Sequence, residues 1–296
     1  MNPLMDHANL FPWIGFLIGA CLGSFLNVVA YRVPRNLSVV KPRSTCPACE
    51  VPIPCFLNIP VVGWLILKGK ARCCGAKISA RYWVVEMVLG FSFAWIFYSY
   101  LDHQDTGVSI ASAIFVWLLI GVVVIDLETM LIPDRFSMGG AGVGFCLSVY
   151  FPSIHHINFH PLGIESLVAG LHSFVGILIG SGLLYWIGSV ASRFFGRDAL
   201  GEGDIKLLGC VGAFCGWKGA VFCIFGGAVL GCALLIPFLL WQKMNVSKEG
   251  DSENEPLGFG MEIPFGPYLA LAALGYFFGL SKWVDPWFAW SAPLAF

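Results

Sequence analysis

The chain has 296 residues and is 57% hydrophobic but only 12% charged. Because soluble domains carry about 25% charged residues, this composition excludes an ordinary soluble protein. The formal net charge of −1 gives no indication of nucleic-acid binding, and we expect no nucleic-acid partner.

Eight apolar runs are long enough, or nearly long enough, to cross a bilayer as helices. A helical span needs about 20 mostly apolar residues, and runs of this length indicate helices rather than a barrel. The sequence therefore predicts an all-α polytopic membrane protein with about eight transmembrane helices and short spans at 136–151 and 205–218. The runs are 11–31, 82–101, 108–127, 136–151, 166–190, 205–218, 220–241 and 264–281.

The distribution of Lys and Arg predicts the orientation of these spans. Nine of the seventeen basic residues lie between Arg32 and Arg81. When the eight spans alternate, only Lys218 and Lys282 fall on the side opposite that segment. Because cytoplasmic loops are enriched in Lys and Arg, we expect the 32–81 segment to be cytoplasmic and both termini to be periplasmic.

The first run carries small residues at regular spacing, followed by polar ones. Gly15, Gly19 and Gly23 recur every four residues, which favours close packing against another helix. Asn27 and Arg32 lie near the membrane edge, where polar groups usually have a partner or a task.

A cysteine-rich segment follows the first span. It contains Cys46, Cys49, Cys55, Cys73 and Cys74. The cytoplasm is reducing, which disfavours disulfides, and a CxxC pair with a later cysteine group is typical of a four-cysteine zinc site. The adjacent pair is irregular, so Cys55 competes as the fourth ligand, and free or redox-active thiols are the alternative.

Acidic residues stand at the cytoplasmic ends of two predicted spans. Asp126 ends the third run, and Asp204 opens the sixth run behind Gly201, Glu202 and Gly203. In an eight-helix bundle both aspartates can lie at the same depth. An acid in such a place is costly unless it is paired, solvated or functional.

Two kinds of chemistry fit this pair of acids. Close carboxyl groups share one proton, so one can activate water while the other polarises a peptide carbonyl, as in an aspartic protease. Gly201 and Gly203 would then let an extended substrate approach. A proton-coupled transporter could use the same acids, although it predicts inverted repeats that the sequence does not show. A non-catalytic zinc scaffold would leave both acids unexplained.

Five stretches, in order along the chain, resemble the type IV prepilin peptidases, a family of membrane aspartic proteases with a GxGD motif. They are GSFLNVVAYRVP at 23–34, the cysteine segment with Asn58-Ile59-Pro60, Asp126 with LIPD at 131–134, GEGDIKL at 201–207 and IPFGP at 263–267.

The resemblance implies that Asp126 and Asp204 form the catalytic pair of a peptidase. Its substrates would be prepilins or pseudopilins, whose basic leader is cut after a Gly at the cytoplasmic face of a bacterial inner membrane. The apolar stem of the substrate would lie between the spans, in contact with membrane lipid. Residues expected to support the substrate or the site loops are Gly201, Gly203, Glu202, Lys206, Asp134, Asn27 and Arg32.

The cysteine segment departs from the family pattern of two CxxC pairs. Cys74 matches the last cysteine of that pattern, but Ala71 stands in the place of the third. The resemblance therefore favours zinc ligation by the four residues Cys46, Cys49, Cys73 and Cys74, with Cys55 as the fallback. Because an all-thiolate site leaves no open position, the zinc is expected to be structural.

The resemblance also implies a second activity, N-methylation of the new terminus with S-adenosylmethionine. No strand leads into a GxGxxG turn and a helix, so the sequence assigns no site for this donor. Glu86, an acid inside the second span, is a weak candidate. A peptidase without methyl transfer is the nearest alternative enzyme. The expected parts are a first transmembrane helix at 1–31, a zinc-binding cytoplasmic domain at 32–81 and a peptidase bundle at 82–296.

Overall fold

The structure is a computed structural model that describes residues 10–41, 44–46, 48–101, 106–157, 163–196, 200–246 and 264–288. Its long helices are α2 (Phe11–Arg32), α4 (Ala80–Ile96), α5 (Thr106–Thr129), α6 (Asp134–Tyr150), α7 (Ile164–Phe195), α8 (Glu202–Val246) and α9 (Gly266–Gly275). Shorter turns of helix are η1 (Cys55–Asn58), α3 (Val62–Leu67), η2 (Phe97–Leu101), η3 (Pro152–His155), η4 (Tyr276–Leu280) and α10 (Ser281–Val284). Within these ranges the chain forms no strand, only two isolated bridges, so the all-α prediction is confirmed.

In the part of the chain that the structure describes, five helices are long and apolar enough to cross a membrane: α2, α4 with the start of η2, α5, α7 and α8 as far as Pro237. The predicted runs at 205–218 and 220–241 both fall within α8, whose backbone leaves helical geometry at Gly216 (φ 67°, ψ −179°). The predicted run at 136–151 corresponds to α6, which has 17 residues. The last predicted run corresponds to α9, η4 and α10, with a break at Gly279.

Two compact units make up the chain. Unit 1 comprises residues 1–125 and 150–158, and unit 2 comprises residues 126–149 and 159–296. The boundary therefore falls immediately before Asp126, in the last turns of α5.

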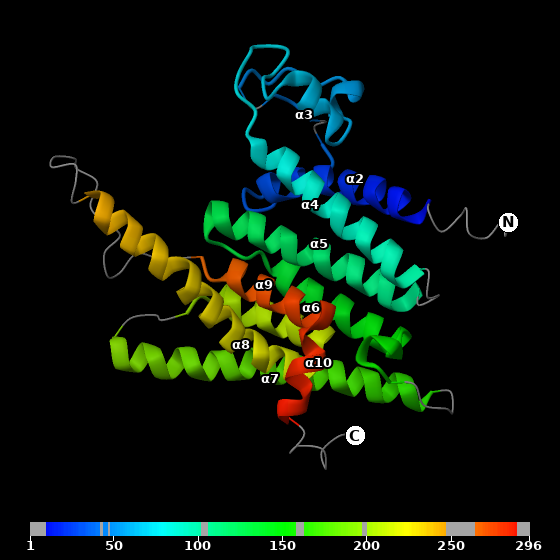
Figure 1. The fold of residues 1–296 in the computed structure, drawn as a ribbon, viewed down its shortest axis with the longest axis vertical. Coiled ribbons are helices and arrows are strands. Elements are labelled where there is room, and N and C mark those ends of the chain that lie inside the picture. Colours follow the sequence, from blue (N-terminus) through cyan, green and yellow to red (C-terminus); the bar gives the residue numbers. More distant parts are fainter. Residues whose placement is uncertain are drawn as a thin grey trace. The chain divides into compact units, whose positions relative to one another are not determined.

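In unit 1, α2 and α4 run antiparallel along a seam of glycines (Figure 1). A Cβ at Gly15 would lie 2.7 Å from the carbonyl oxygen of Phe93, and one at Gly23 would lie 2.8 Å from Cα of Glu86. Side chains of ordinary size would push the helices apart, so the predicted packing role of this stripe is confirmed. Trp117 of α5 donates from Nε1 to the carbonyl oxygen of Leu22, 3.3 Å away, and ties α5 to α2.

In unit 2, a similar seam joins α7 to the first half of α8. Gly176 and Gly212 face each other so closely that a Cβ on either would overlap the carbonyl of the other. Ser173 of α7 donates to the carbonyl oxygen of Ala213 at 3.0 Å, and Ser148 of α6 donates to the same oxygen at 3.3 Å. These bonds satisfy hydroxyl groups that would otherwise be costly in an apolar interior.

We expect Gly176→Ala to lower the thermal stability of the detergent-solubilised protein, because overpacking of a tight contact costs about 1–3 kcal/mol. The matched control is Gly182→Ala in the same helix, where a Cβ would meet nothing within 4 Å. That change should be neutral or stabilising by up to about 1 kcal/mol, the helix-propensity difference between Gly and Ala. Equal unfolding temperatures for the two variants would contradict the close α7–α8 contact.

Candidate functional site

Asp126 and Asp204 both lie in unit 2, on different helices, and are close enough to interact electrostatically. Asp126 is in the last turn of α5 and only 4% exposed, whereas Asp204 is half-buried in the first turn of α8. Helix α5 ends three residues after Asp126, and the next residue, Met130, adopts a left-handed conformation with φ 51°. The structure thus brings together the two acids that the sequence singled out.

A backbone amide orients the Asp126 carboxylate. The N–H of Gly266, the first residue of α9, donates to Asp126 Oδ2 at 3.1 Å. A Cβ on Gly266 would lie 2.7 Å from that same oxygen. Any side chain at this position would therefore displace the Asp126 carboxyl group. The sequence motif at 263–267 does not by itself reveal this contact.

Ile132 lies between Gly203 of α8 and Gly266 of α9. An ideal Cβ at Gly203 would lie 3.0 Å from Cβ of Ile132, and one at Gly266 would lie 3.2 Å from Cδ1 of Ile132. The α5–α6 connection thus lies against glycines next to Asp204 and Asp126. In the sequence, Ile132 stands out only as part of the LIPD motif, because nothing local shows which residues an isoleucine will touch.

The charged residues around the pair are not equivalent. Lys206 Nζ lies 2.8 Å from Asp134 Oδ1 at the start of α6, and 3.9 Å from Glu202. The Glu202 side chain is 90% exposed, against 62% for Asp134. Asp134 and Lys206 therefore tie α6 to α8 beside the pair, while Glu202 projects into solvent. Gly201 lies beside Asp204, with its ideal Cβ 3.5 Å from Oδ2.

This arrangement suits acid–base hydrolysis. Two carboxyl groups that interact closely are most stable when they share one proton. The deprotonated group can take a proton from water while the protonated group donates to the atom under attack. Glycines on both sides leave room for an extended chain to approach the backbone.

The cysteine segment of unit 1 brings four thiols into one cluster, formed by Cys46, Cys49, Cys73 and Cys74. Their sulfur atoms all lie within 4.8 Å of one another. The separations are 3.2 Å between Cys49 and Cys73 and 3.7 Å between Cys46 and Cys74. Tetrahedral zinc with 2.3 Å bonds separates its sulfur ligands by about 3.8 Å. The cluster can therefore hold a metal ion, whereas the side chain of Cys55 lies outside the described part of the structure.

Two turns place these thiols. In the first turn, the N–H of Glu50 donates to the carbonyl oxygen of Cys46, and Glu50 has a φ of 58°. In the second turn, the N–H of Gly75 donates to the carbonyl oxygen of Ala71, and Gly75 has a φ of 71°. Ala71 is buried at the base of the second turn, at the place of the missing cysteine, while Cys73 and Cys74 follow on the same turn. The adjacent pair can thus serve as two ligands.

The thiols differ in how readily they ionise. Backbone N–H groups of Ala48 and Cys49 lower the pKa of Cys46 to about 7. The hydrogen bond to the neighbouring Cys49 sulfur raises the pKa of Cys73 to about 12, and burial, hydrogen bonds to the other two thiols and the charge of Cys46 act in the same direction. A bound cation would remove that penalty.

Three further candidates lie in unit 1, apart from the acid pair of unit 2. Asn27 Nδ2 donates to the carbonyl oxygen of Tyr82 at 3.1 Å, and Arg32 donates to that of Ser38 at 3.0 Å. Glu86 accepts the N–H of Val61 at 2.6 Å through Oε2. All three connect the helices to each other or to the cysteine segment.

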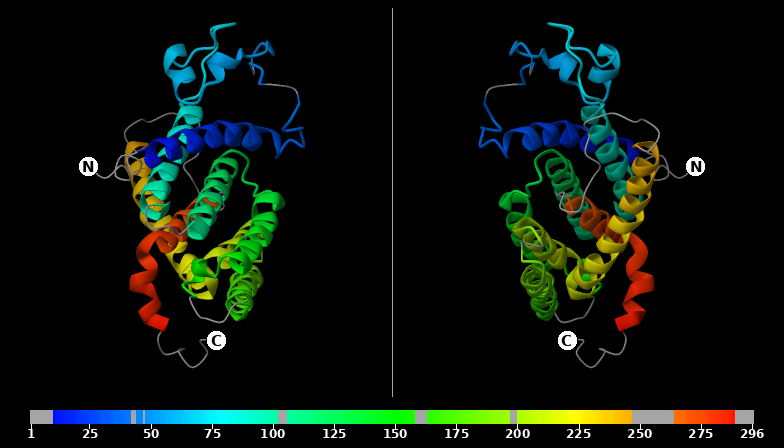
Figure 2. Two further views of the ribbon diagram at one scale, coloured as in Figure 1. Left: turned by 90° about the vertical axis from the view of Figure 1, so that its right-hand side faces the viewer. Right: turned by 90° about the vertical axis from the view of Figure 1, so that its left-hand side faces the viewer.

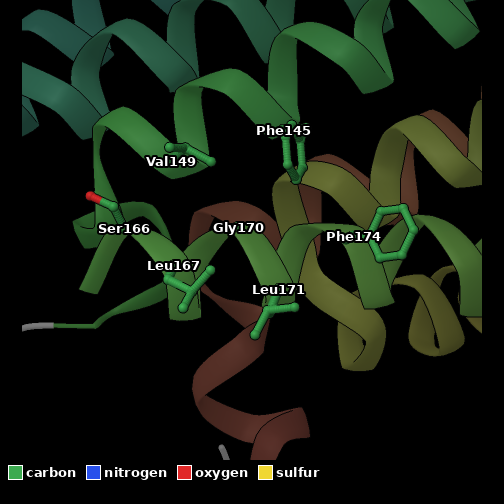
Figure 3. A pocket seen from close by; sticks show the side chains of 7 residues that line it. All are labelled: Phe145, Val149, Ser166, Leu167, Gly170, Leu171 and Phe174. Atoms are coloured by element: carbon green, nitrogen blue, oxygen red, sulfur yellow. The ribbon is translucent and has the colours of Figure 1, made fainter. Parts of the chain in front are cut away.

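A separate cavity of about 370 Å³ lies between α6 and α7 (Figure 3). Its lining contains no titratable side chain, so it offers no acid–base chemistry. The lining residues are Phe145, Val149, Ser166, Leu167, Gly170, Leu171 and Phe174.

We expect the isolated protein to carry about one metal ion per chain, bound by four cysteines as in structural zinc sites. Cys46→Ser and Cys49→Ser should each reduce the metal content several-fold, because one thiolate is lost. The control is Cys146→Ser, since Cys146 is an exposed thiol outside the cluster. Elemental analysis of all three variants makes the comparison, and unchanged metal in the first two would contradict the assignment.

Two protein-family models match this chain, one over the part that contains the cysteine cluster and one over the part that contains the acid pair. Residues 17–100 match the bacterial peptidase A24 N-terminal domain, and residues 113–236 match the type IV leader peptidase family. The second match contains both Asp126 and Asp204. No solved structure gives a significant match.

Similar proteins cover most of the chain. Relatives named prepilin leader peptidase/N-methyltransferase include one from Aeromonas salmonicida, 29% identical over 92% of this chain and 93% of its own length. One from Dichelobacter nodosus is 31% identical over 86% and 87%, and one from Klebsiella pneumoniae is 35% identical over 73% and 91%. With these matches and its paired acids, the chain belongs to the type IV leader peptidase family.

Proposed function

We propose that this protein is a prepilin leader peptidase and N-methyltransferase of a bacterial inner membrane, with Asp126 and Asp204 as its catalytic pair. The observation that carries the peptidase assignment is the meeting of these two carboxyl groups beside Gly266 and Gly203. The names of relatives that are 29–35% identical support the same activities.

Hydrolysis follows from the shared proton of the pair. The ionised carboxylate accepts a proton from water as its oxygen attacks the peptide carbonyl, and the other acid donates its proton to the carbonyl oxygen. Collapse of the resulting diol breaks the C–N bond, and the released amine takes a proton from the pair. The Gly266 N–H holds Asp126 in place throughout.

The substrate class is a peptide with a basic leader and an apolar stem. Glu202 fits the leader because its exposed carboxylate stands two residues before Asp204. Glu202→Gln should raise KM several-fold with little change in kcat, because the charge binds substrate without taking part in the chemistry. Steady-state cleavage of a prepilin peptide tests this, and a fall in kcat at unchanged KM would contradict it.

The cysteine cluster is proposed to bind structural zinc. Cys46, Cys49, Cys73 and Cys74 supply four thiolates and leave no coordination position for a substrate. Bound zinc would fix the fold of the 44–78 segment. S-adenosylmethionine would supply the methyl group for the new N-terminus. The contact between Glu86 and Val61 gives Glu86 a structural partner and adds no support for donor binding.

The decisive test uses purified protein in detergent with a model prepilin. Asp126→Asn and Asp204→Asn should each reduce cleavage by at least about a thousandfold, since a paired acid is lost from general acid–base catalysis. Both should still methylate a pre-cut peptide if methyl transfer uses a separate site. Mass spectrometry reports the cut and the added methyl group.

Glu165→Gln is the matched control, because Glu165 lies in the first turn of α7 and loses the same charge. It should cleave at the native rate. If either aspartate variant also cleaved at the native rate, the catalytic pair would be wrong. Proton uptake that depends on both acids, without cleavage, would instead favour the transporter.

Gly266→Ala tests how the pair is positioned. The new Cβ would clash with Asp126 Oδ2, so cleavage should fall at least tenfold while the protein remains folded. Gly142→Ala in α6 is the control, since its Cβ would meet nothing within 4 Å. Native cleavage by Gly266→Ala would show that the contact is dispensable.

A further inference from the structure

The short helix α3 carries an exposed apolar stripe. Ile59, Val62, Leu65 and Ile66 are between 46% and 64% exposed. Residues three and four apart share one face of a helix, so Val62, Leu65 and Ile66 project together, and exposed Ile59 lies in the extended segment just before α3. The other side of α3, with buried Gly63, packs against the backbone of Leu57 in η1.

Two contacts fix the depth of α3 against the membrane span that begins at Ala80. The ring of Trp64 lies 5.8 Å from that of Trp83 in the first turn of α4. The N–H of Val61, just before α3, donates to Glu86 one turn deeper. Figure 1 and Figure 2 show the segment that holds α3 at this end of α4. Because Trp gathers at membrane–water interfaces, this pair of rings is expected at the level of the lipid headgroups.

The junction is built to hold α3 there. Val61 has φ 65° and ψ −54°, and the N–H of Val62 bonds to the carbonyl oxygen of Pro60 at 2.6 Å. This is a γ-turn of the strained kind, rare for a β-branched residue. Such a turn persists only where the surroundings enforce it, and the buried carboxylate of Glu86 binds its central N–H.

The positive charge of the residues around the stripe indicates which kind of partner contacts it. Exposed Lys68 and Lys70 follow it directly, and residues 32–81 contain nine basic residues against one acid, Glu50. A basic leader peptide or a second copy of this segment would be repelled. Anionic lipid headgroups attract such lysines by about 1 kcal/mol each, and the acyl chains below them suit the apolar side chains.

We propose that α3 is an interfacial anchor. Its stripe of Ile59, Val62, Leu65 and Ile66 lies in the cytoplasmic leaflet, and Lys68 and Lys70 bind the phosphates of anionic lipids. Glu86 is the positioning residue that holds the anchor against α4. This inference rests on the cytoplasmic location of the 32–81 segment, which belongs to the proposed function. The lipid-binding surface that it identifies does not include Asp126 or Asp204.

The test uses full-length protein in nanodiscs of phosphatidylcholine and phosphatidylglycerol. A photoreactive amino acid replaces Ile66, and Leu17 of α2, 64% exposed within a span, is the lipid-facing reference. Val40, 77% exposed elsewhere in the cysteine-rich segment, is the control. Mass spectrometry identifies each adduct. Position 66 should capture phospholipid as well as position 17 does, and at least tenfold more than position 40.

The lysines are tested in the same assay. Phosphatidylglycerol should be enriched at least threefold among adducts at position 66 relative to the bilayer. The double variant Lys68→Gln/Lys70→Gln should lower the phosphatidylglycerol fraction of these adducts to its fraction in the bilayer, whereas Lys282→Gln in α10 should leave the enrichment unchanged. Enrichment that the double variant leaves intact overturns the headgroup assignment. Absence of lipid adducts at position 66, equal capture at position 40, or capture of a prepilin or second copy overturns the anchor.

Lipid capture is read without any cleavage step. An inactive but lipid-captured protein would therefore count against the proposed peptidase and not against the anchor. Retained metal content and native elution show that each variant is folded. Glu86→Ala should lower capture at position 66 several-fold, and Glu86→Gln, which keeps an acceptor oxygen for Val61, should restore most of it.

Discussion

Close approach of helix backbones at glycine is the constraint on which the rest of this structure depends. Inside a bilayer the lipid is as apolar as the side chains, so helices associate through tight packing and hydrogen bonds. Gly176 against Gly212 and Gly23 against Glu86 allow contacts that a single methyl group would prevent. These seams fix the helix pairs α7–α8 and α2–α4, and they leave the ends of the helices free to carry chemistry.

The acid pair uses the same device for another purpose. Gly203 and Gly266 leave room on α8 and α9 for one bulky side chain, Ile132, and bring a backbone N–H to Asp126. The α5–α6 connection turns sharply at Met130 and is held to α8 by the pair of Lys206 and Asp134. Glycine thus sets both the spacing of the helices and the surroundings of the two carboxyl groups.

Unit 1 follows a different logic, because its cysteine-rich segment is too short to bury a large core of its own. Four thiols collect in one cluster, and a buried carboxylate holds the turn that begins α3. The thiol cluster and the Glu86 contact therefore hold this segment together, as glycine packing holds the helices together. Together they place an exposed apolar face and its lysines at the end of α4.

The sequence alone determined the all-α membrane class, the seam of Gly15, Gly19 and Gly23, and the two acids worth pairing, because apolar length, glycine spacing and costly charges are local properties. The catalytic and zinc-binding roles remain predictions. Only the tertiary structure decided that Gly266 binds Asp126, that Ile132 lies between Gly203 and Gly266, and that Glu86 holds Val61. Each of these contacts joins residues from separate elements, and their geometry depends on how whole helices pack.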